Sequence, residues 1–174
     1  MKEDFPKRRT TRLKHFDYST TGAYFITICT KDRRHLLSDI VGTGVPDGPY
    51  VKLTQYGEIV EKTINQLNDF YDHISIDDYV IMPNHIHLIV FINNKKKSGI
   101  GPSGTPVPTA QNSALSKFIS TMKRFSNKEC GESLWQLRSY DHVIRDQADY
   151  DKRVKYIYEN PMRWHFDELY FEEK

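Results

Sequence analysis

The sequence predicts a single globular domain in which β-strands and α-helices are mixed. Its 174 residues suffice for one domain with a sizeable core, and 38% of them are apolar and 13% aromatic, as in folded chains. In some stretches the apolar residues follow the pattern of β-strands, and in others they recur at helical spacing. No apolar stretch approaches membrane-spanning length, and the N-terminus lacks the hydrophobic segment of a signal peptide, so we expect a cytoplasmic protein.

The N-terminal half begins with a strand signal and continues with a helix signal. Residues 24–30 have strong β propensity and few charges, which predicts an interior strand. A turn-rich excursion follows at 42–49. From 54 to 71 apolar residues recur at helical spacing, with Thr54 as a suitable N-cap, and this predicts a helix.

Two histidines one residue apart stand at the start of the next apolar run. Residues 78–82 and 85–92 predict two strands joined by a turn at 83–84. His85 and His87 would then point to the same face of one strand. Imidazole is the commonest side-chain metal ligand near neutral pH, so the pair predicts a metal site. Packed or surface histidines would give the same tripeptide.

The C-terminal half opens with an expected Gly/Pro-rich loop at 94–111. A helix with an apolar stripe is expected over 113–127, and an extended segment or strand over 134–144. A last helix is expected to be capped by Asp146 and ended by Pro161.

Basic residues are grouped, although the net charge is only +2. Some lie in an N-terminal arm at 1–15, some on one ridge of the 113–127 helix, and one beside the aromatic residues of the 134–144 segment. Such groups suit a polyanion, although a solvated surface gives the same pattern. The candidate DNA contacts are Arg8, Arg9, Arg12, Lys117, Arg124, Lys128 and Arg138.

The last helix has an apolar stripe and a polar row. The stripe is expected to pack against the sheet and consists of Tyr150, Val154, Ile157 and Tyr158. The polar row consists of Asp149, Arg153, Tyr156 and Asn160, at i, i+4, i+7 and i+11. Tyr156 and Asn160 are therefore neighbours one turn apart. Spacing alone leaves open whether Tyr156 is a packing residue or a nucleophile.

Five motifs follow one another along the chain: GAYFITICT at 22–30, MPNHIHL at 82–88, LWQ at 134–136, HVIRD at 142–146 and YIYENP at 156–161. In this order they resemble the REP-associated tyrosine transposases, which belong to the single-tyrosine HUH transposases. The resemblance covers the chain from about residue 16 to residue 163.

The resemblance implies a ferredoxin-like α+β sandwich in which an antiparallel sheet carries the two histidines and helices cover one face. It implies a metal-dependent single-stranded DNA endonuclease and strand transferase that acts through a 5′-phosphotyrosine, at hairpin-forming repeats. Tyr156 matches the nucleophile, and His85, His87 and Asn160 match the metal ligands. Mg²⁺ or Mn²⁺ is the expected ion, because open octahedral coordination suits a site that must release DNA. Tetrahedral zinc is the structural alternative.

Other assignments share these motifs. Tyr158 is the competing nucleophile, although the apolar stripe directs it toward the core. The same motifs would suit an HUH nuclease of replication or plasmid mobilisation, or a protein that binds repeat hairpins without cleaving them. In each case we expect one domain over 1–174, a monomer or homodimer, associated with the nucleoid and with single-stranded or hairpin DNA as its partner.

Overall fold

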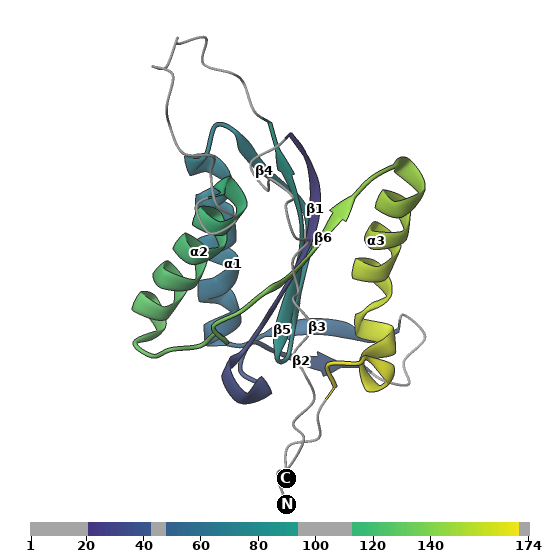
Figure 1. Cartoon of the computed structure of the whole chain (residues 1–174). Helices are drawn as coiled ribbons and strands as arrows, with labels where there is room; N and C mark the ends of the chain where they lie inside the picture. The colour runs from purple at the N-terminus through teal and green to yellow at the C-terminus, as the bar shows by residue number, and fades with distance from the viewer. Residues whose placement is uncertain (1–20, 43–47, 94–112, 171–174) are drawn as a thin grey trace, which may run out of the picture.

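The computed structural model describes residues 21–42, 48–93 and 113–170 (Figure 1). The expected N-terminal arm at 1–15, with Arg8, Arg9 and Arg12, lies outside the described residues, and so does the expected loop at 94–111. Within the described ranges, no helix combines the length and the apolar character needed to cross a membrane.

A four-stranded antiparallel sheet forms the centre of the molecule, in the order β4-β5-β1-β6. Its strands are β1 (Gly22–Cys29), β4 (Ile74–Met82), β5 (His85–Ile92) and β6 (Tyr140–Ile144). The interior position of β1 and the β4-β5 hairpin are as predicted. Only the last part of the expected 134–144 segment is a strand.

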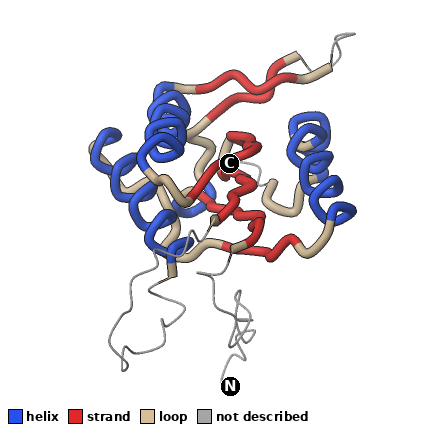
Figure 2. The backbone as a smooth tube through the Cα atoms, turned by 90° about the horizontal axis from the view of Figure 1, so that it is seen from above, coloured by secondary structure: helices blue, strands red, loops and turns tan. Residues whose placement is uncertain are grey.

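Helices cover both faces of this sheet (Figures 1 and 2). On one face lie α1 (Gln55–Phe70) and α2 (Ala114–Cys130), and on the other α3 (Gln147–Glu159), which leads into the short 3₁₀-helix η3 (Pro161–Phe166). The α+β class with an antiparallel sheet is confirmed.

The expectation that helices cover only one face is wrong, because β1 and β5 are apolar on both sides. One side of the sheet packs in the core that includes α1 and α2. On the other side, Phe25 and Ile89 belong to a second core cluster that also contains Ile157 of α3. Strands that are buried on both faces carry near-continuous apolar runs rather than alternating ones.

Polar side chains fix where α1, α2 and α3 begin. Thr54 accepts a hydrogen bond from the Gly57 amide at the start of α1, and Ser113 accepts one from the Ser116 amide at the start of α2. Asp146 does the same for α3. Each cap satisfies a backbone N–H that the helix itself leaves unpaired. The caps predicted for α1 and α3 are confirmed.

A second, two-stranded sheet was not predicted. It consists of β2 (Ser38–Val41) and β3 (Tyr50–Leu53), which pair antiparallel. Each strand has four residues, too few for a periodicity to stand out, and the segment between them is rich in glycine and proline. A further short turn, η1 (Lys31–Arg33), follows β1.

Gly57 marks the closest approach of α1 to the chain that leads into β2. A methyl carbon at this buried position would overlap the carbonyl oxygen of Leu37 and also press on Leu53. We expect Gly57→Ala to lower the free energy of unfolding by about 2 kcal/mol or more, because overpacking outweighs the gain of about 1 kcal/mol in helix propensity. Denaturant unfolding measures this difference.

The matched control is Gln66→Ala, an exposed position of the same helix. It is expected to change the free energy of unfolding by no more than about 0.5 kcal/mol. Stabilisation by Gly57→Ala would contradict the close approach.

Candidate metal and tyrosine site

His85 and His87 lie side by side on the face of β5 that is covered by α3 and η3. Their ring centroids are 4.5 Å apart, and the two residues are 0% and 2% exposed. The predicted common direction of the two side chains is therefore confirmed. Trp164 of η3 packs on His85, and the ring of Phe25 stacks on His87 at 5.0 Å.

One nitrogen of each imidazole is held by a neighbouring side chain. His85 Nδ1 lies 2.8 Å from Asn84 Oδ1, and the Asn84 amide nitrogen donates to the Leu169 carbonyl, so Asn84 Oδ1 is the acceptor and His85 Nδ1 the donor. His87 Nδ1 lies 2.8 Å from the hydroxyl of Thr27. The Nε2 atoms of both histidines are buried and have no hydrogen-bond partner among the described residues.

This arrangement is typical of metal-ligating histidines, in which an outer partner orients the ring and leaves the other nitrogen free. Burial lowers the pKa of His85 to about 4 and lowers that of His87 well below its ordinary value. Both rings are therefore neutral at neutral pH, with a lone pair on Nε2 of His85. A neutral imidazole is the form that binds a metal ion.

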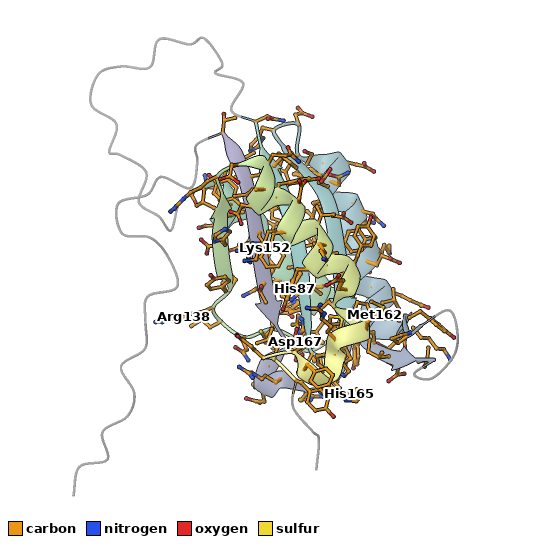
Figure 3. All side chains as sticks on the ribbon, turned by 90° about the vertical axis from the view of Figure 1, so that its right-hand side faces the viewer. His87, Arg138, Lys152, Met162, His165 and Asp167 are labelled. Carbon is orange, nitrogen blue, oxygen red and sulfur yellow. The ribbon has the colours of Figure 1, made fainter. Side chains whose placement is uncertain are left out.

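Asp167 completes the group from the segment that follows η3. Its carboxylate and the two histidines offer ligand atoms that all lie within 4.8 Å of one another. His87 and Asp167 lie close together near the C-terminal end of α3 (Figure 3). These three side chains form a group that could hold a metal ion.

Asn160 lies against the same group but is engaged by the carboxylate. Its amide nitrogen donates to Asp167 Oδ2 at 3.0 Å, and its Oδ1 is buried without a hydrogen-bond partner among the described residues. Asn160 Oδ1 could thus serve as a fourth ligand atom for an ion, beside the two imidazole nitrogens and the Asp167 carboxylate. It is the last residue before Pro161, which ends α3 as predicted.

Tyr156 brings a hydroxyl to the same place. Its ring centroid is 5.1 Å from that of His87, and its hydroxyl donates to Asp167 Oδ2 at 3.0 Å. Burial, together with the charge and hydrogen bond of Asp167, raises the pKa of Tyr156 to about 12. The phenol is therefore protonated at neutral pH, and its proton points at a carboxylate.

Tyr158 is not buried against the sheet, so this part of the predicted apolar stripe is wrong. It is 69% exposed, whereas Ile157 is 2% exposed. At 100° per residue, Tyr158 lies well around the helix from both Tyr156 and the buried centre of the stripe. Its hydroxyl instead interacts with Asp78.

Asp167 is the site residue that the sequence did not indicate. It lies 80 residues or more from the two histidines in the chain and belongs to no periodic pattern. Its position follows from η3, in which the buried Trp164 anchors the turn that returns the chain to the sheet.

The basic residues predicted on α2 do not lie at this site. Lys117, Arg124 and Lys128 are exposed on α2, which covers the opposite face of the sheet (Figure 1). Thr121, expected on the same ridge, is instead half-buried, and its hydroxyl accepts a hydrogen bond from Tyr71. Arg138 is exposed on the segment between α2 and β6 and projects from the edge of the molecule (Figure 3).

Arg124 and Lys128 do share a surface cavity of about 740 Å³, which we call the α2 groove. Lys123 and Trp135 also line it, and so does Leu137, which is 95% exposed. The chain that borders this groove runs on into β6, where Tyr140 pairs with Thr27, the hydroxyl partner of His87. The groove and the histidine site are thus linked around the β6 edge of the sheet.

Comparisons with known proteins give relatives over nearly the whole chain. An uncharacterized protein of Haemophilus influenzae is 32% identical over 94% of this chain and 93% of its own length. A REP-associated tyrosine transposase of Escherichia coli is 26% identical over 84% of this chain and 70% of its own length. No family model matches the chain.

A solved structure has the same fold. It is that of a REP-associated tyrosine transposase bound to a REP hairpin, and the TM-score is 0.59 at 21% identity. The alignment covers 90% of this chain and 76% of that one.

Proposed function

The chain belongs to the family of REP-associated tyrosine transposases, and we propose that it cleaves and rejoins single-stranded DNA through Tyr156. The main support is that a hydroxyl, a carboxylate and two imidazole nitrogens lie close together. The hydroxyl of Tyr156 and the carboxylate of Asp167 lie beside the two buried Nε2 atoms, which have no hydrogen-bond partner among the described residues, and Tyr156 itself is 38% exposed. A nucleophile beside a set of metal ligands suits phosphodiester chemistry.

The covalent step forms a bond between Tyr156 Oη and phosphorus and breaks the bond between phosphorus and the 3′ oxygen. The 5′ phosphate stays on the tyrosine, and the leaving 3′ oxygen takes up a proton from solvent, so the released strand ends in a 3′-hydroxyl. At a pKa of about 12 the phenol needs a proton acceptor, and Asp167 Oδ2 already accepts its hydrogen bond. Rejoining reverses the step and needs no nucleotide cofactor, because the phosphotyrosyl ester retains the bond energy.

His85, His87, Asp167 and Asn160 would hold the divalent cation. We propose Mg²⁺ or Mn²⁺, because oxygen ligands make up half of this set and no thiolate belongs to it. When bound, the ion would offset the negative charge that develops on the phosphoryl oxygens. The chain's own part is to orient both imidazoles through Asn84 and Thr27 and to aim Tyr156 at the attacked phosphorus.

The substrate we propose is a hairpin-forming repeat with a single-stranded segment beside its stem. The relative that was solved with a REP hairpin supports this choice. In this proposal the α2 groove and Arg138 contact the backbone on one side of the sheet, and the single strand passes the β6 edge to reach Tyr156.

The test uses the full chain with a single-stranded palindromic oligonucleotide from the flanks of its gene. With Mn²⁺ or Mg²⁺ present, a 3′-labelled oligonucleotide should transfer its label to the protein, whereas a 5′-labelled one should release a free fragment with a 3′-hydroxyl. EDTA should prevent both, and mass spectrometry should find the nucleotide on Tyr156. Tight hairpin binding without any adduct would instead support the binding-only function.

We predict that the cations of the α2 groove contribute to hairpin binding. Arg124→Gln combined with Lys128→Gln should weaken hairpin binding at every sequence tested and reduce the slope of log K against log salt by up to about 2. Fluorescence anisotropy over a salt series measures this slope. Lys52→Gln combined with Lys152→Gln removes two exposed cations on β3 and α3, away from the groove, and should leave the slope unchanged. An equal loss in both double variants would indicate a general charge effect and contradict the groove.

A further inference from the structure

A second polar cluster lies between β6 and α3, beside the tyrosine site. His142 Nε2 is 2.7 Å from Asp149 Oδ2, and Arg153 Nε donates to Asp149 Oδ1 at 3.2 Å. The pKa of Asp149 is lowered by its contacts with His142 and Arg153 despite partial burial, so this carboxylate stays charged. Asp149 therefore holds a guanidinium in a fixed position on the sheet-facing side of α3.

The guanidinium of Arg153 lies over a ring that also touches the proposed chemistry. Its central carbon is 5.3 Å from the centroid of Phe25, which stacks on His87 at 5.0 Å and meets Tyr156 edge-on at 6.0 Å. Arg153 precedes Tyr156 by three residues, so the two side chains are neighbours on one helix face.

Arg153 has hydrogen-bond donors that no described residue uses. Asp149 uses its Nε, and the two terminal amino groups make no hydrogen bond to any of the described residues. The side chain is 24% exposed, so a ligand that enters from solvent reaches it. A guanidinium with free amino groups matches the oxygens of a phosphate.

The charge of Arg153 is unfavourable for the site unless an anion binds there. Its field already lowers the pKa of His87, and it would repel a cation held by the two histidines. A phosphodiester between the cation and the guanidinium would turn this repulsion into two attractions.

We propose that Arg153 binds the DNA phosphate that Tyr156 attacks, with Asp149 and His142 as the residues that position it. This inference rests on the proposed function. The phosphate keeps its negative charge when it passes to the tyrosine, so the same contact holds the phosphotyrosyl group in place for rejoining.

The experiment compares Arg153→Gln and Arg153→Lys with Lys152→Gln, which removes an exposed charge from the neighbouring position of α3 (Figure 3). Arg153→Gln should slow adduct formation on the single-stranded oligonucleotide by about 10²-fold, as expected for one lost donor to the developing charge. Arg153→Lys should restore part of the rate, and Lys152→Gln should stay within about twofold of wild type. Denaturant unfolding of each variant shows whether it remains folded.

A second readout is independent of cleavage. In a Tyr156→Phe background without divalent ions, Arg153→Gln should reduce the salt dependence of oligonucleotide binding by about 0.7 in the slope of log K against log salt. Asp149→Asn keeps the guanidinium of Arg153 but removes the carboxylate charge that holds it in position. It should slow the reaction by about 10-fold and leave the salt slope unchanged.

The outcomes separate the two hypotheses. If wild type forms adducts and Arg153→Gln matches it in both rate and salt slope, the inference is wrong and the proposed function stands. If wild type forms no adduct on any hairpin oligonucleotide, the proposed function fails. The salt slope then still decides whether Arg153 contacts the backbone.

Discussion

Tyr156→Phe is expected to abolish the covalent protein–DNA adduct, with a loss of at least about 10³-fold in the rate of cleavage. The substitution removes one oxygen and keeps the ring that packs edge-on against Phe25 and His87. The fold and DNA binding should therefore be retained. Denaturing gels with a 3′-labelled oligonucleotide measure the adduct, and anisotropy measures the binding.

Tyr158→Phe is the matched control, because it removes the same atom two residues away. Tyr158 is 69% exposed and its hydroxyl interacts with Asp78 rather than with the histidine group. We expect cleavage by this variant within about twofold of wild type. An adduct that persists in Tyr156→Phe and disappears in Tyr158→Phe would assign the nucleophile to Tyr158.

His87→Ala is expected to remove the binding of Mn²⁺ and to slow cleavage by at least about 10²-fold. It deletes one of the two Nε2 atoms that no described residue engages, and it leaves the hydroxyl of Thr27 without its imidazole partner. Calorimetric titration of Mn²⁺ measures the affinity. Unfolding in EDTA shows separately how much stability the cavity costs, and a loss of about 1–3 kcal/mol is expected for a truncated buried ring.

His165→Gln provides the control for the loss of an imidazole. His165 is exposed on η3, and its ring contacts Tyr170 rather than the histidine pair. Its Mn²⁺ affinity should equal that of wild type. Mn²⁺ binding that survives in His87→Ala would contradict the proposed metal group.

Most of the regular structure follows from local patterns. A clear hydrophobic periodicity needs a long enough element, and this holds for β1, the β4-β5 hairpin and the helices α1, α2 and α3. Each of these helices also begins with a capping side chain. The β2-β3 hairpin was not predicted, because four-residue strands are too short to show a clear hydrophobic periodicity. The common direction of His85 and His87 needed only the alternation of a strand.

Sequence patterns sufficed for the motifs that resemble the transposase family, for the pairing of Tyr156 with Asn160 on one helix, and for the two imidazoles on one strand face. These are relations between residues a few positions apart, which the geometry of a single strand or helix fixes. The packing of the elements was needed to place α3 over the histidine face, to bring Tyr156 rather than Tyr158 into contact with His87, and to add Asp167 to the group. Those relations depend on how separate elements pack together. The second apolar face of the sheet is buried against Ile157 and Trp164. This burial sets the rotation of α3 and the path by which the chain returns to the sheet after it.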